Sequence, residues 1–160
     1  PKYMYGFNIN VGYKGLTLSS FFQGVQGGYI YPSLNFAWPF NNGAGVTKQW
    51  INDSWTPANT KASLPILTTA TGATENYQPS TFWLKSASYL RMKDIQLRYE
   101  LPSKITSKLI VHKVAVFVNA NNLLTIASYK DFDPEKNTTN DNLYEYPSVK
   151  TFSCGLNVTF

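Results

Sequence analysis

Residues 150–160 read KTFSCGLNVTF, and this stretch decides the fold class. Its apolar side chains fall on every second position: Phe152, Cys154, Leu156, Val158 and Phe160. Alternation with a period of two places the apolar and polar sets on opposite faces of a β-strand. Strands of about 9–11 residues with one face of each kind are the repeating unit of a transmembrane β-barrel. A soluble β-sandwich produces the same alternation, so this strand alone leaves both architectures open.

The composition favours a β-rich chain and excludes several function classes. The 160 residues are 16% aromatic and only 14% charged, whereas globular domains carry about 25% charged residues. The 14 basic and 9 acidic residues give a net charge of +5. The basic residues are scattered, apart from Lys104, Lys108 and Lys113 near one turn. Nucleic-acid binding requires a clustered basic surface, so nucleic-acid binding is not predicted. No apolar run approaches the roughly 18 residues of a membrane-spanning helix, which leaves a barrel of strands open.

Catalysis has little support in the sequence, and no enzyme activity, cofactor or metal site is predicted. The chain has one histidine, His112, and one cysteine, Cys154. Nothing resembles a Ser-His-Asp order, a His/Cys metal spacing or a glycine-rich phosphate loop. The Cys154 side chain lies on the apolar parity of its strand, where it is expected to act as a small hydrophobe.

Five antiparallel strands are predicted at about 3–13, 16–25, 82–100, 111–121 and 149–160. Lys14-Gly15 forms a two-residue hairpin turn between the first two, with the glycine supplying a positive φ. In the third strand Arg91 and Lys93 share the parity of the apolar Ile95. We therefore expect this part of the strand to lie outside the hydrocarbon or to contain a β-bulge.

The connections alternate between short and long. The links at 14–15 and after Leu101 are short, whereas the predicted loops at about 26–81 and 122–148 are long. Bacterial outer-membrane barrels have short periplasmic turns and long extracellular loops, and this sorting favours a barrel over a sandwich. Five strands are too few to close a barrel, which needs at least eight. Since the chain also begins at Pro1 without a methionine, we expect a piece of a longer protein.

Four ordered motifs resemble the closing barrel strands of the SusC/RagA-type TonB-dependent outer-membrane transporters. They are SYLRMKDIQLRYELP at 88–102, VFVNANNLLT at 116–125, YKDFDPE at 129–135 and YPSVKTFSCGLNVTF at 146–160. The resemblance covers most of the chain; residues 26–48 and 62–80 show no recognisable pattern. The plug domain and the TonB-contact segment, which are N-terminal in that family, have no counterpart here.

The resemblance implies an all-β fold: the C-terminal part of a 22-stranded transmembrane barrel in the bacterial outer membrane, its outer face against lipid. It also implies TonB-dependent import of oligosaccharides or peptides together with a SusD-like surface lipoprotein that acts as a lid. The TonB complex would act through the missing N-terminal part. Within such a transporter this chain would form barrel wall and extracellular mouth.

Nine aromatic residues are candidate site residues. Aromatic rings stack on sugars and anchor interfaces, so five in the first long loop are candidates for substrate or lid contact: Tyr29, Tyr31, Trp38, Trp50 and Trp55. We favour the simpler interpretation that they pack a small core of the loop itself. Four others are candidates for the aromatic girdles at the lipid boundary: Trp83, Tyr89, Tyr99 and Phe160.

The acidic run Asp131, Asp133 and Glu135 is expected to be a solvated loop. A calcium loop needs more oxygen ligands and a turn glycine, so cation binding is the weaker hypothesis.

Two other functions stay open at this stage. One is a siderophore or cobalamin receptor of the same barrel type, which would have no lipoprotein partner. The other is a soluble carbohydrate-binding β-sandwich, in which a second sheet would cover the apolar face.

Overall fold

The chain divides into two compact units. A computed structural model describes residues 1–32, 38–69, 76, 78–107, 111–131, 133–136 and 146–160. The sheet unit comprises Pro1–Tyr29, Ser86–Glu135 and Tyr146–Phe160, and the loop unit comprises Ile30–Lys85 and Lys136–Glu145.

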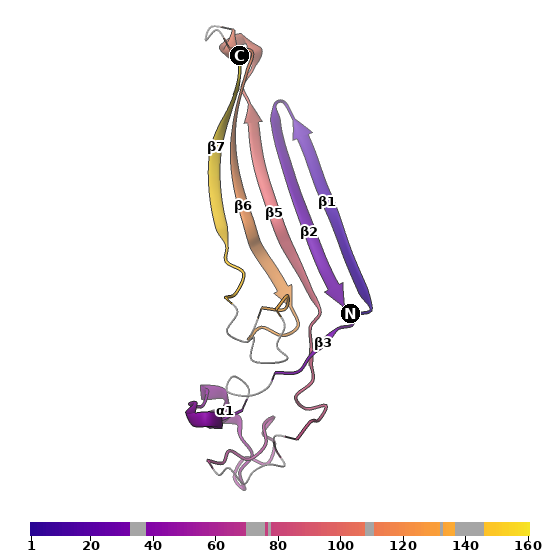
Figure 1. Cartoon of the computed structure of the whole chain (residues 1–160), viewed down its shortest axis with the longest axis vertical. Helices are drawn as coiled ribbons and strands as arrows, with labels where there is room; N and C mark the ends of the chain where they lie inside the picture. Colours follow the sequence, from indigo (N-terminus) through magenta and orange to yellow (C-terminus); the bar gives the residue numbers. More distant parts are fainter. Residues whose placement is uncertain (33–37, 70–75, 77, 108–110, 132, 137–145) are drawn as a thin grey trace. The chain divides into compact units, whose positions relative to one another are not determined.

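The sheet unit is built on one antiparallel sheet of five strands in the order β1-β2-β5-β6-β7 (Figure 1). The strands are β1 (Tyr3–Tyr13), β2 (Leu16–Gln26), β5 (Tyr89–Glu100), β6 (Lys113–Ala127) and β7 (Thr151–Thr159). Each strand pairs with its neighbour in an antiparallel register. The predicted all-β, antiparallel architecture is confirmed for this part of the chain, although barrel closure lies beyond these five strands.

Alternate register rows across the sheet are apolar and polar. Val11, Leu18, Leu97, Val118 and Cys154 are successive cross-strand partners, and the adjacent row is Asn10, Ser19, Gln96, Asn119 and Ser153. Because neighbouring residues of a strand point to opposite faces, one face of the sheet is apolar and the other polar.

No layer of described residues covers the apolar face. Its side chains are 37% to 60% exposed at seven positions spread over the five strands: Ile9, Leu18, Leu97, Val116, Val118, Leu156 and Val158. Val114 is half-buried. A β-sandwich buries such a face against a second sheet, so this exposure disagrees with the sandwich alternative.

A β-bulge at Lys93 resolves the charge pattern of β5. Met92 pairs with Phe22 and Asp94 with Phe21, which leaves Lys93 as an extra residue. The extra residue changes the parity of the strand. As a result Arg91 pairs with Gln23 on the polar face, while Leu90 and Met92 point to the apolar face. The predicted bulge is confirmed.

The observed strand bounds differ from the predicted ones mainly in β5 and β6. β5 begins at Tyr89, after the two-residue strand β4 (Lys85–Ser86), which pairs with β3 (Tyr29–Ile30). β6 continues to Ala127, six residues past its predicted end. Asn122 adopts a φ of 52° inside β6, a conformation that asparagine tolerates better than most residues. Its side chain donates a hydrogen bond to the Val149 carbonyl at 3.1 Å, so the strand passes through this irregularity.

The short connections lie at one end of the sheet (Figure 1). Lys14 and Gly15 have φ values of 47° and 85°, as a type I′ hairpin requires. The short helix α2 (Ser103–Thr106) lies between β5 and β6. Both predicted short links therefore connect strands at the same end of the sheet.

The loop unit contains little regular structure. Its described residues include the 3-10 helix η2 (Asn41–Gly43) and the helix α1 (Lys48–Asp53). The Thr47 side chain accepts a hydrogen bond from the Trp50 backbone N–H and so caps α1. Among the described residues, no helix is both long and apolar enough to span a membrane.

Candidate functional site

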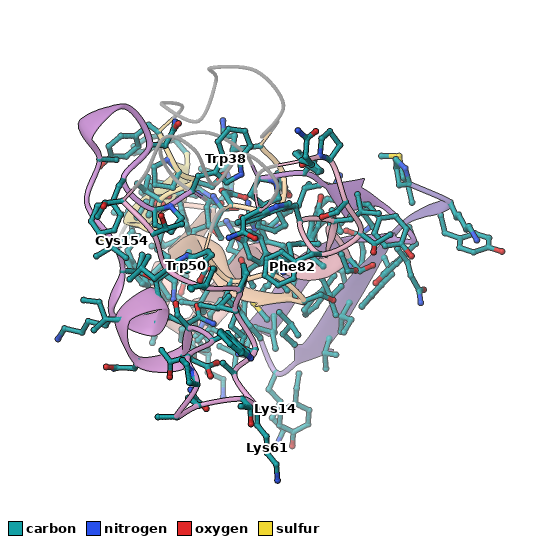
Figure 2. The ribbon with its side chains drawn as sticks, turned by 90° about the horizontal axis from the view of Figure 1, so that it is seen from below. Lys14, Trp38, Trp50, Lys61, Phe82 and Cys154 are labelled. Carbon is teal, nitrogen blue, oxygen red and sulfur yellow. The ribbon has the colours of Figure 1, made fainter. Side chains whose placement is uncertain are left out.

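An aromatic cluster forms the core of the loop unit. The Trp83 ring lies 6.2 Å from the Trp50 ring, 6.5 Å from Trp38 and 4.9 Å from Phe82, between centroids. Figure 2 labels Trp38, Trp50 and Phe82. Trp50 and Trp83 are 7% and 4% exposed. The packing of Trp38 and Trp50 agrees with the interpretation that the loop aromatics build a small core.

Trp83 does not lie where a lipid-facing girdle residue would. Its indole Nε1–H donates to the Asn76 carbonyl at 2.8 Å, within the loop unit. A girdle residue presents its ring to the lipid boundary, whereas the Trp83 ring is enclosed by other aromatic rings. The sequence suggested a girdle position because Trp83 lies within the strand predicted at about 82–100, but β5 begins six residues after Trp83.

The other three candidates of the first loop are placed differently. Trp55 is 41% exposed and lines a cavity of about 550 Å³ in the loop unit. Tyr29, the last residue of the first segment of the sheet unit, is 66% exposed. The Tyr31 hydroxyl is buried and has no hydrogen-bond partner among the described residues. Of the five predicted contact residues, Tyr29 and Trp55 therefore remain the most accessible.

A buried ionic cluster lies where β5 meets the second long loop. The Arg91 guanidinium donates to Asp133 through Nη2 and to Glu135 through Nη1, both at 2.7 Å. Its Nε–H donates to the Thr125 hydroxyl on β6 at 2.9 Å. The Lys93 ammonium lies 2.7 Å from Glu135. We call Arg91, Lys93, Asp133 and Glu135 the ionic cluster. It joins β5 to the loop that follows β6, and the Arg91 bond to Thr125 ties it to β6 as well.

Asp133 also accepts hydrogen bonds from the backbone. The Glu135 N–H donates to its Oδ1 at 3.0 Å, and the Ser148 N–H donates to its Oδ2 at 2.9 Å. Burial alone would raise the pKa of the Asp133 carboxyl, but the hydrogen bonds from Arg91, Glu135 and Ser148 outweigh burial and hold this pKa well below its usual range. Through Asp133 the cluster fixes both the departing and the returning ends of the loop.

The expectation of a solvated acidic loop is wrong for Asp133 and Glu135. Their side chains are only 5% and 18% exposed and are paired with Arg91. Asp131 lies beside Tyr129, and burial together with the charge of Asp131 raises the pKa of the Tyr129 hydroxyl. Among the described residues, no group of three metal-ligating side chains lies close enough together to hold a metal ion.

Tyr89 lies on the polar face, which does not fit the predicted girdle. Because of the bulge at Lys93, Tyr89 pairs with Val25 on that face and is 7% exposed. It lines a cavity of about 410 Å³ whose described lining also includes Tyr29, Lys93 and Glu135. Tyr99 and Phe160, at 41% and 85% exposed, keep the accessibility that a girdle residue needs, so their role stays a prediction.

Sequence reasoning did not identify Arg91 as a central residue. Asp133 and Glu135 lie 42 and 44 residues further along the chain. Only the register of the sheet brings them to Arg91. The available signal was an arginine and a lysine on the apolar parity of their strand. Charged side chains that are buried require nearby partners of opposite charge.

Two curated relatives match the whole chain. It is 31% identical over 172 residues to TonB-dependent receptor P3 of Formosa agariphila, of which it covers 16%. It is 28% identical to TonB-dependent receptor P26 of the same organism, of which it covers 17%. The chain thus spans about a sixth of the length of these relatives. No protein-family model matches the chain.

Solved structures of the RagAB peptide importer share the fold. In its open-open state the match has a TM-score of 0.76 at 27% identity, covering 98% of this chain and 17% of the other. In its closed-closed state the values are 0.75 and 29%, with the same coverage. Over its whole length the chain therefore matches SusC/RagA-type TonB-dependent transporters. The resemblance of the four motifs is therefore confirmed, and the relatives of this SusC/RagA-type chain are transporters and receptors, not enzymes.

Proposed function

We propose that this chain forms barrel wall and extracellular mouth of an outer-membrane transporter that imports oligosaccharides or peptides. The observation that carries the proposal is the apolar face, which stays exposed on all five strands while the opposite face is polar. In water such a surface favours association, whereas against lipid it is the stable arrangement.

The two outer strands support a larger barrel. Among the described residues, β1 pairs only with β2 and β7 only with β6. Unpaired edges of 11 and 9 residues promote aggregation unless further strands cover them. Additional strands from a longer chain would satisfy both edges and close the barrel.

The partners are proposed from the same likeness. RagAB is described as a peptide importer, which supports peptides as one substrate class and a SusD-like lipoprotein as the partner. Coupling to the TonB complex is supported by the two TonB-dependent receptors that match the chain. A siderophore or cobalamin receptor is the alternative, and the RagAB likeness does not favour it.

Spin labels on adjacent residues test the placement of the apolar face. The full-length protein is labelled at Cys154, with any cysteine outside this chain removed, and compared with a Cys154→Ser/Ser153→Cys variant. Cys154 lies on the apolar face and Ser153 on the polar face at the same depth. Oxygen concentrates in lipid, and a nickel chelate stays in water. We therefore expect oxygen to be the stronger relaxation agent for the label at position 154 and the nickel chelate to be the stronger one at position 153. A label at 154 that the nickel chelate relaxes more would contradict lipid contact.

Growth of the native bacterium tests the import function. A strain lacking the full-length gene is compared with its parent on a peptide mixture, on oligosaccharides and on haem or cobalamin as limiting nutrients. We expect a defect on peptides or oligosaccharides, reproduced by deletion of TonB or of the lipoprotein gene. A defect confined to haem or cobalamin would favour the alternative receptor.

A further inference from the structure

The cavity of about 550 Å³ in the loop unit has a mostly apolar lining. This volume is typical of ligand pockets, which enclose about 300–1,000 Å³. Six of its nine described lining residues are apolar: Trp55, Ala62, Leu64, Pro65, Ile66 and Phe82. The remaining three are Ser63, Asn76 and Ser80, so no described lining residue carries a charge.

Two of the polar lining residues already have partners. The Ser63 hydroxyl donates to Asp53, and its N–H donates to the other oxygen of that carboxylate at 3.3 Å. The Asn76 amide donates to the Ile66 carbonyl at 3.3 Å, and its backbone carbonyl accepts from the Trp83 indole at 2.8 Å. These bonds hold the walls in place, and they leave mainly hydrocarbon and aromatic surface for a ligand.

The Trp55 and Ile66 side chains stay exposed beside this cavity. They are 41% and 51% exposed, whereas Trp50 and Trp83 of the same unit are buried. The Trp55 N–H donates to the Leu64 carbonyl at 2.9 Å and the Leu64 N–H to the Asp53 carbonyl at 3.2 Å, so the backbone beneath both walls is fixed. Exposed apolar groups around a preformed cavity mark a binding site.

We infer that this pocket binds an apolar side chain of an imported peptide. The inference rests on the proposed import function and narrows its substrate class. A sugar would bring several hydroxyl groups that lose water on entering, and each needs a hydrogen-bond partner. Trp55 offers a stacking face, but the described lining offers few free polar groups to pair with those hydroxyls. An aliphatic or aromatic side chain needs none.

Competition between two defined peptides tests the inference. Cells that make the full-length transporter and its lipoprotein receive a pentapeptide with a central phenylalanine and a matched one with a central serine, and mass spectrometry follows their depletion. We expect Trp55→Ala to lower the preference for the phenylalanine peptide by about tenfold. Ile66→Ser is expected to lower it less, and Trp55→Phe to restore part of it.

Ile51→Ala is the matched control. Ile51 belongs to the same unit and is 62% exposed, but it is not among the residues that line the pocket. This variant should keep the wild-type preference. Heat-modifiable migration in gel electrophoresis shows whether each variant assembles. If Trp55→Ala does not assemble, the peptide preference of Ile66→Ser tests the pocket instead.

Three results would overturn the inference. The first is an unchanged peptide preference in the assembled variants. The second is a loss of maltoheptaose uptake with peptide preference intact, which would assign the pocket to sugars. The third is loss of the lipoprotein from the purified complex with preference intact, which would make the pocket a lid contact. Wild-type cells that import neither peptides nor maltoheptaose would instead show that the proposed function itself is wrong.

Discussion

At the scale of single residues, Arg91 is the residue on which the second long loop depends. Its side chain is 4% exposed and pairs with two carboxylates of the loop. A buried charge that loses its partner costs about 3–5 kcal/mol, even where the pair itself adds little net stability. The loop should therefore be sensitive to any change at Arg91.

We expect Arg91→Met to release the loop that follows β6. The substitution keeps an unbranched apolar stem but leaves Asp133 and Glu135 without the guanidinium. Limited proteolysis of the full-length protein in membranes should then cut within 136–148 at least about tenfold faster than in wild type, the factor that corresponds to 1.4 kcal/mol.

Arg98→Met is the control for this prediction. Arg98 pairs with Glu100 at 3.4 Å, and both side chains are more than a third exposed. Exposed pairs contribute about 0–1 kcal/mol, so cleavage should stay near the wild-type rate. Equal cleavage of the two variants would contradict the anchoring role of Arg91.

Acid should release the same loop. The pKa of Asp133 is lowered from 3.8 in the docked loop, so the undocked state binds the proton more tightly. The stability that this carboxylate contributes is present above pH 3.8 and decreases as the pH falls below it, by up to about 1.4 kcal/mol per pH unit. Pepsin cleavage within 136–148 should rise between pH 4.5 and 2.5, and Asp133→Asn should flatten this rise while cleaving faster at pH 4.5.

At the scale of secondary-structure elements, alternation predicted the strands well but not all of their ends. The bounds of β1 are those predicted, because its alternation is interrupted only at Met4 between Tyr3 and Tyr13. The end of β6 was placed too early because Asn121-Asn122 has the composition of a turn. The paired strand and the Asn122 hydrogen bond to Val149 override that local preference. The pairing between two strands cannot be predicted from the local sequence of either strand alone.

Aromatic rings over glycines are a second feature of these elements. Phe117 interrupts the polar parity of β6, and the register pairs it with Gly155 on β7. A Cβ at position 155 would lie 2.5 Å from the Phe117 ring, and one at Gly24 would lie 2.2 Å from the Tyr5 ring. The glycines therefore make room for the rings, and the rings cover backbone that a glycine leaves open.

We expect Gly155→Ala to destabilise the sheet by about 1–3 kcal/mol, because the Phe117 ring must move aside. The measurement is the temperature at which the full-length barrel loses its heat-modifiable migration. Gly12→Ala is the control, since its Cβ would meet nothing closer than 3.9 Å. If Phe117→Ala fails to reduce the effect of Gly155→Ala, the ring contact is not its cause.

At the scale of the whole molecule, the two faces of the sheet should respond oppositely to charge. Val118 and Ser153 lie in adjacent rows of the sheet, Val118 on the apolar face and Ser153 on the polar one. Lysine on a lipid face near the bilayer midplane costs about 2–4 kcal/mol. We expect Val118→Lys to reduce the amount of assembled protein in outer-membrane fractions and Ser153→Lys to leave it near wild type. Similar losses in both variants would contradict a lipid-facing apolar face.

The candidate site was predictable in part. Composition and loop length pointed to the aromatic residues of the first long loop, and Trp55 does line a cavity there. Which tryptophans are buried and which are exposed depends on packing within the loop unit, where Trp50 and Trp83 lie against each other. Tryptophan is thus a buried core residue at some positions of the loop unit and an exposed pocket residue at another, and the sequence does not distinguish the two.

The sequence by itself determined the strands, their two faces, the hairpin at Lys14-Gly15 and the family, because alternation, turn residues and ordered motifs are local properties of the chain. Only the tertiary structure decided the partners of Arg91, the position of Tyr89 on the polar face and the pocket that Trp55 lines. Each of these depends on contacts between segments far apart in the chain. A single inserted residue at Lys93 is enough to move the first residues of β5 from one face to the other.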